Sequence, residues 1–146
     1  MRISIASPQD AVSIDRARMR ETVRTVLDGE GISDGEISLA FVDNATIHQL
    51  NLRYLNHDEP TDVLSFPLSE PNSGRLAGEL VVGALVARDQ AASRGHAIEA
   101  ELALYVIHGL LHLCGYDDKS EAAARQMRQK EREYLQRLQL PDITDH

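Results

Sequence analysis

The chain has 146 residues and a mass of 16.2 kDa, a size that fits one domain around one hydrophobic core. Hydrophobic residues make up 42% and charged residues 26%, values typical of soluble globular proteins, which excludes the disordered and fibrous classes. No apolar run approaches the roughly 18 residues of a membrane-spanning helix, and the N terminus lacks a signal-peptide core. We therefore expect a cytosolic protein that does not associate with membranes.

The net charge of −8 argues against broad, non-specific binding of nucleic acid. The lone Cys114 cannot form an internal disulfide, which agrees with a reducing compartment. Any contact with nucleic acid needs a local group of cations. One stretch of arginines is the best candidate, although the simpler interpretation is that these arginines line the solvated face of a helix. These arginines are Arg16, Arg18, Arg20 and Arg24.

In the first half of the chain, hydrophobic periodicity predicts two strands and two helices. Residues 2–6 alternate as a strand does, and apolar positions at helical spacing follow over residues 13–27 until a glycine-rich stop. Residues 36–43 alternate again. Asp43 and Asn44, both good N-caps, then precede a helix over 45–55.

The second half begins with a turn at residues 58–60, because proline holds the preceding residue extended. A strand over 62–67, a loop over 69–78 and a strand over 79–83 follow. Three helices complete the chain, over residues 84–93, 98–113 and 120–138. We expect a single α+β domain over residues 1–146, with a small mixed four-stranded sheet packed against about five helices.

The residues that indicate a function most specifically lie at the end of the helix over 98–113. His108 and His112 are four residues apart, so their imidazoles project from one helix face at a separation that suits one shared ion. Gly115 lets the backbone reverse, so that Asp117 or Asp118 can supply a third ligand. Three protein ligands with one open position are typical of catalytic zinc, and the sequence predicts such a site at the end of a central helix.

The same spacing occurs in the metzincin zinc peptidases, but one of their essential residues is absent here. In those enzymes a Glu follows the first histidine and takes a proton from water. This chain has Gly109 in that place, which has no side chain. We therefore do not expect peptidase chemistry of that type.

Three blocks of sequence resemble the YbeY family of endoribonucleases, which are also described as rRNA maturation factors. The family pattern His-Gly-x-Leu-His-Leu-x-Gly-Tyr-Asp-His matches residues 108–118 at every fixed position except the last. The pattern Leu-Asn-x-x-Tyr-Arg-x-x-Asp-x-Pro-Thr-Asp/Asn-Val-Leu-Ser-Phe-Pro is matched over residues 50–67, and Gly-Asp/Glu before an apolar strand is matched over 78–82. The blocks fall in family order and cover nearly the whole chain.

The resemblance implies an α+β fold, one zinc ion and cleavage of single-stranded RNA. It also implies a role in processing ribosomal RNA, at the 3′ end of 16S rRNA, and in ribosome quality control, with ribosomal or assembly proteins as possible partners. The family alignment assigns Asp118 as the third ligand beside His108 and His112. It further places three polar residues along the substrate cleft: Thr61, Asp62 and Ser65. Without the resemblance, these residues would be interpreted as turn and strand-end residues that form local backbone hydrogen bonds.

Two positions depart from the family pattern. Asp118 replaces the family's third histidine, and a carboxylate lowers the charge of the site and favours harder ions such as manganese as well as zinc. Leu55 replaces an arginine thought to help catalysis. Arg53 or His57 could supply a nearby cation, although a helical residue two positions away faces elsewhere.

The proposed chemistry follows from an ion with an open position, which can polarise a phosphoryl oxygen or activate water. Asp117 is a candidate to orient a ligand histidine, and its alternative role is that of a turn residue. The acidic charge and Leu55 keep a second hypothesis open. In it, the chain is a metal-stabilised ribosome assembly or RNA-binding factor that does not cut.

Overall fold

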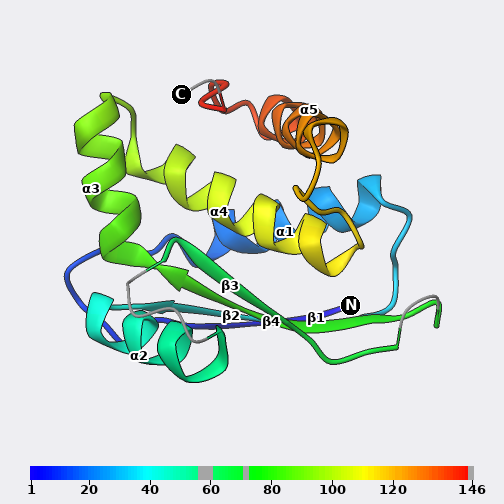
Figure 1. Cartoon of the computed structure of the whole chain (residues 1–146), viewed down its shortest axis with the longest axis horizontal. Helices are drawn as coiled ribbons and strands as arrows, with labels where there is room; N and C mark the ends of the chain where they lie inside the picture. The colour runs from blue at the N-terminus through cyan, green and yellow to red at the C-terminus, as the bar shows by residue number, and fades with distance from the viewer. Residues whose placement is uncertain (56–60, 71–72, 145–146) are drawn as a thin grey trace.

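The computed structural model describes residues 1–55, 61–70 and 73–144. Its strands form one mixed sheet. In spatial order, the first three strands are parallel to one another, and the fourth is antiparallel to the strand beside it. This arrangement confirms the predicted α+β class (Figure 1). In spatial order the strands are β1 (Arg2–Ala6), β2 (Gly35–Val42), β4 (Leu76–Gly83) and β3 (Val63–Pro67).

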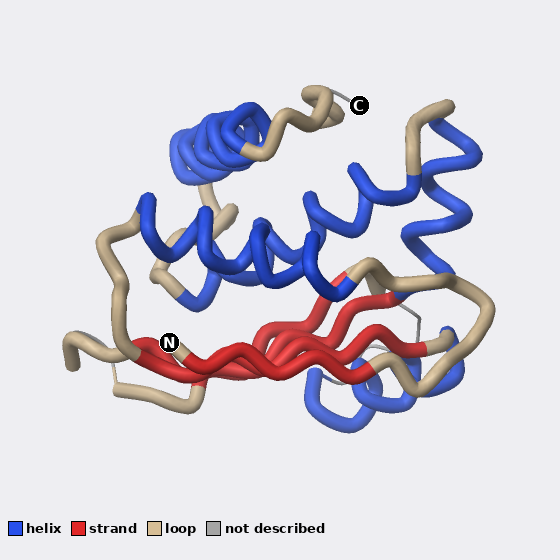
Figure 2. Tube along the Cα trace, turned by 180° about the vertical axis from the view of Figure 1, so that it is seen from behind, coloured by secondary structure: helices blue, strands red, loops and turns tan. Residues whose placement is uncertain are grey.

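Helices cover both faces of the sheet. One short helix lies on one face, two others lie against the opposite face, and the last helix forms an outer layer over them (Figures 1 and 2). No helix in the described ranges is long and apolar enough to cross a membrane. The helices are α1 (Arg16–Gly29), α2 (Asn44–Leu55), α3 (Ala84–Arg94), α4 (Ile98–Leu113) and α5 (Glu121–Arg137).

The period-two pattern of β2 divides its side chains between two cores. Ile37, Leu39 and Phe41 are buried in the main core beneath α1 and α4. Val42 belongs to a smaller core on the other face, where Ile47 of α2 packs. The buried sheet therefore gives the helices above it a fixed platform.

Helix α4 is the central element of the fold. It packs against α1, α3, α5 and the strands β3 and β4, and every residue over 100–107 is buried. A helix that is apolar almost all round must lie inside a protein. Its C-terminal part carries His108 and His112, which are only partly buried, so the rigid core ends where the predicted site begins.

Two predicted boundaries are wrong for identifiable reasons. Helix α1 begins at Arg16 rather than residue 13, because Asp15 is its N-cap and accepts a hydrogen bond from the Arg18 N–H at 3.1 Å. The loop predicted over residues 69–78 ends earlier, since Leu76 already pairs with Gly35 of β2. The turn predicted at residues 58–60 lies outside the described residues.

Gly35 of β2 lies against the backbone of β4, so a substitution there tests the register of these two strands. Gly35 has a φ of +147°, and a Cβ there would overlap the carbonyl of Leu76. We expect Gly35→Ala to lower the free energy of unfolding by about 3 kcal/mol or more, measured by urea denaturation. Gly31, with a φ of +74° and open space around it, is the control, and its change to alanine should cost about 1–2 kcal/mol. Equal losses at the two positions would contradict the register.

Candidate metal centre

The two histidines of α4 converge on one point. The Nε2 atoms of His108 and His112 lie 3.1 Å apart, and their ring planes meet at 81° with centroids separated by 4.6 Å. This geometry results from the four-residue spacing, which places both imidazoles on one helix face one turn apart. Both nitrogens therefore face the same small volume.

A glycine corner brings the carboxylate of Asp118 to the same volume. Gly115 has a φ of +102°, and the Tyr116 N–H returns to the Leu111 carbonyl at 3.0 Å, which closes the end of α4. One possible ligand atom from each of His108, His112 and Asp118 lies within 4.8 Å of the others. The structure thus brings together the three residues that the sequence singled out.

Glu131 of α5 is a part of the site that sequence reasoning missed. Its Oε2 lies 2.8 Å from Nδ1 of His108, and its side chain is only 8% exposed. Such a carboxylate holds the proton on Nδ1 and leaves Nε2 free to bind a metal. The available signal was an acidic residue on the apolar face of α5, four positions after the buried Met127.

The two imidazoles have opposite pKa shifts. Burial alone would lower the pKa of His108, but the hydrogen bond and the charge of Glu131 more than offset it, so the pKa is raised. Burial and the neighbouring His108 lower the pKa of His112. At neutral pH, His112 therefore favours the unprotonated form that binds a metal.

These donors fit a divalent ion. Two imidazole nitrogens on one tetrahedral zinc, each at about 2.0–2.1 Å, are separated by about 3.3 Å, close to the 3.1 Å between the two Nε2 atoms. The carboxylate of Asp118 completes a set of two nitrogens and one oxygen. Asp118 is exposed, so the group faces solvent, and a tetrahedral ion held by these three donors would have one position left for water or substrate.

Two cavities meet at His108, and they contain the residues predicted for the cleft. A cavity of about 500 Å³ is lined by Thr61 and Asp62 together with His108 and Asp118. A second cavity of about 300 Å³ is lined by Ser65 and both histidines. The hydroxyl of Ser65 also donates to the carbonyl of Gly109 at 3.2 Å, which ties β3 to α4 beside the histidines.

Arg53 and Asp117 are not among the residues that form the metal group. Arg53 is exposed and stacks over Tyr54, with 5.5 Å between the guanidinium carbon and the ring centroid, while Leu55 lines the second cavity. Asp117 accepts the backbone N–H of Lys119 at 3.0 Å, which is the turn role considered for it. His57 lies outside the described residues.

Packing explains why a glycine separates the two histidines. A Cβ on Gly109 would lie 2.8 Å from Cδ2 of Leu80 and 3.2 Å from the hydroxyl of Ser65. Leu80 is fully buried, so its side chain has little room to move aside. A peptidase-type Glu at this position would not fit against the sheet, which supports the expectation that such chemistry is absent.

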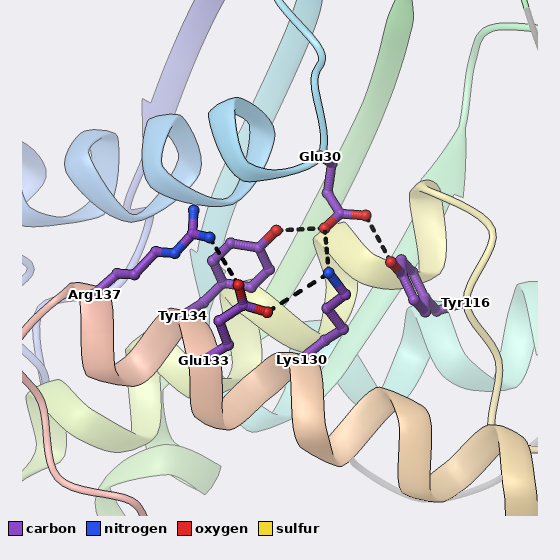
Figure 3. A network of polar contacts seen from close by, with 6 residues as sticks. All are labelled: Glu30, Tyr116, Lys130, Glu133, Tyr134 and Arg137. Atoms are coloured by element: carbon purple, nitrogen blue, oxygen red, sulfur yellow. Dashed lines mark hydrogen bonds and ion pairs between the residues drawn. The ribbon is translucent and has the colours of Figure 1, made fainter.

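A second polar network stabilises the turn that carries Asp118. Glu30, just after α1, accepts a hydrogen bond from the Tyr116 hydroxyl at 2.8 Å and another from Tyr134 of α5, and it pairs with Lys130 (Figure 3). Tyr116 lies in the turn, and Lys130 and Tyr134 flank Glu131 on α5. One carboxylate thus fixes two elements of the site relative to each other.

The Glu30 contact predicts a pH-dependent stability. Burial, followed by the hydrogen bond and the charge of Glu30, raises the pKa of Tyr134 far above that of an unfolded tyrosine, about 10. Its stabilisation is complete below pH 10 and is lost as the pH rises above it, because the unfolded chain then releases the proton first.

We expect Tyr134→Phe to lower the free energy of unfolding by about 1–2 kcal/mol at pH 8. The difference from the unchanged protein should shrink between pH 10 and 11. Urea denaturation across this range measures both, and a difference independent of pH would contradict the role of the hydroxyl.

Comparisons with known proteins identify relatives of this chain. Residues 4–139 match the family described as endoribonuclease YbeY. A protein of that name from Pelotomaculum thermopropionicum is 39% identical over 96% of this chain and 99% of its own length, and one from Salinibacter ruber is 42% identical over 91% and 89%. The solution structure of a Thermotoga maritima protein aligns with a TM-score of 0.67 at 29% identity, over 93% of this chain and 88% of that one. The chain belongs to the YbeY endoribonuclease family.

Proposed function

We propose that the chain is an endoribonuclease that hydrolyses phosphodiester bonds in single-stranded RNA with one bound zinc ion. The observation that carries the proposal is the convergence of His108, His112 and Asp118 where two cavities meet. Membership of a family of endoribonucleases supports RNA as the substrate. The unpaired Cys114 supports a cytosolic location.

Zinc is the ion that the donor set favours. Two imidazoles and one carboxylate with an open position are the ligands of many catalytic zinc centres. The carboxylate of Asp118 is a harder donor than a third imidazole would be, so manganese is the second candidate. Bound at this site, the ion would stabilise negative charge on a phosphoryl oxygen and make a water molecule more acidic.

The side chains of this protein supply position and shape. Glu131 orients His108 through Nδ1, and the Glu30 network fixes the turn before Asp118. Thr61 and Asp62 line the cavity on one side of His108, and Ser65 lines the cavity on the other side. An RNA strand lying across His108 would therefore contact β3 and both cavities.

Ribosomal RNA is the proposed physiological substrate, with maturation of the 3′ end of 16S rRNA as the process and ribosomal or assembly proteins as partners. The three sequence blocks of the family support this assignment. Leu55 favours one alternative, in which the chain binds RNA without cutting it, because a leucine lines the second cavity where the family pattern has a cation.

Metal retention tests the ligand assignment. We expect His112→Ala to abolish zinc retention and Asp118→Ala to lower zinc affinity at least about tenfold, whereas Asp118→His should keep or raise it. Elemental analysis after dialysis measures the bound zinc. Asp117→Ala is the matched control, since its carboxylate caps the turn, and it should retain zinc. Full retention by Asp118→Ala would show that the third ligand is a different residue.

Cleavage of labelled RNA tests the activity. Purified protein should cut a single-stranded fragment of precursor rRNA and leave a duplex of the same sequence intact. A chelator should stop the reaction, and zinc or manganese should restore it. Cleavage that persists without metal would overturn the proposal. Binding without cleavage would leave the non-cutting role in its place.

A further inference from the structure

The cavity that Thr61, Asp62, His108 and Asp118 line extends beyond the residues that would hold the ion. One side of each of three helices lines it. The lining residues of α3 follow one another at intervals of four, and those of α4 and α5 at intervals of one or three, so each helix presents one side to the same space. Its volume of about 500 Å³ is within the range of ligand pockets. The stripes are Val86, Gln90 and Arg94 of α3; Leu104, Tyr105 and His108 of α4; and Ala124, Met127, Arg128 and Glu131 of α5.

The charges in this cavity differ from the acidic balance of the whole protein. Arg94 and Arg128 line it, together with the carboxylates of Asp62, Asp118 and Glu131. Asp118 is assigned to the metal and Glu131 is bound to His108, so a divalent ion offsets both charges. Because Arg94 is paired with Glu101, one uncompensated arginine, Arg128, and one carboxylate, Asp62, then remain in the cavity.

The two arginines differ in what they contact. Arg94 lies 3.8 Å from the fully buried Glu101, which offsets its charge. Within the part of the chain that the structure describes, Arg128 forms no ion pair, and it is exposed at the cavity edge. An unpaired guanidinium in this position can form two parallel hydrogen bonds with a phosphate.

The remaining walls suit a flat, partly apolar group. Leu104 and Met127 are buried, with 8% and 1% exposed surface, and both face the cavity. Gln90 adds an amide that can donate and accept hydrogen bonds. A nucleotide requires a cation for its phosphate, apolar surface for its base and a few polar groups for hydrogen bonds. The cavity offers all three.

Resting on the proposed nuclease function, we propose that this cavity binds one nucleotide of the RNA strand next to the metal centre. The guanidinium of Arg128 binds its phosphate, and the base lies against Leu104 and Met127. The cavity then determines how the strand is placed across His108. Arg128 thus supplies a local positive charge for RNA in a protein whose overall charge of −8 opposes RNA binding.

Titration of the zinc-loaded protein with uridine 5′-monophosphate, followed by nuclear magnetic resonance, tests this proposal without any cleavage. Arg128→Gln should raise the dissociation constant for the nucleotide about tenfold. Its effect on free uridine, which lacks the phosphate, should be less than about twofold. Arg125→Gln is the control, because Arg125 is an exposed arginine of the same helix that is not among the cavity-lining residues described. It removes the same charge and should leave both constants unchanged.

Three results would overturn the proposal: no binding of uridine 5′-monophosphate by the unchanged protein, an unaltered constant in Arg128→Gln, or equal weakening by both substitutions. Both arginines are exposed, so thermal unfolding should show intact folding in each variant. Metal-dependent cleavage by the unchanged protein separates the two proposals. If cleavage persists while the nucleotide titration fails, this subsite alone is wrong.

Discussion

The burial of α4 is the constraint on which the site depends. The helix is enclosed by the sheet on one side and by other helices around it, so its backbone cannot shift without opening the core. Two imidazoles at its partly exposed end are therefore held at a fixed separation before any ion binds. The free energy needed to bring the ligands together is therefore supplied by folding, and metal binding does not have to supply it.

The other contacts that hold the ligands in place are tertiary, and α5 takes part in several of them. Glu131 reaches His108 from α5, and Glu30 connects α5 to the turn before Asp118. Helix α5 therefore does more than cover the core. It orients one imidazole, supports the turn of the carboxylate and forms a wall of the cavity that Arg128 lines.

Local signals explain what could be predicted from sequence. His108 and His112 share a helix face, and Gly115 forces the reversal that returns Asp118, so all three follow from spacing within eleven residues. Glu131 lies 23 residues from His108, and only the packing of α5 on α4 brings them together. The beginning of β4 was missed because Leu76 to Gly78 resemble a loop until they pair with β2. Arg128 gave no local signal at all.

X-ray absorption spectroscopy of the protein loaded with one equivalent of zinc reveals which atoms bind the ion. We expect nitrogen and oxygen neighbours at about 2.0–2.2 Å, with the outer-shell scattering of two imidazoles and no sulfur. A sulfur neighbour at about 2.3 Å would place the ion on Cys114 instead. That result, or a shell without imidazole scattering, would contradict a centre built from His108, His112 and Asp118.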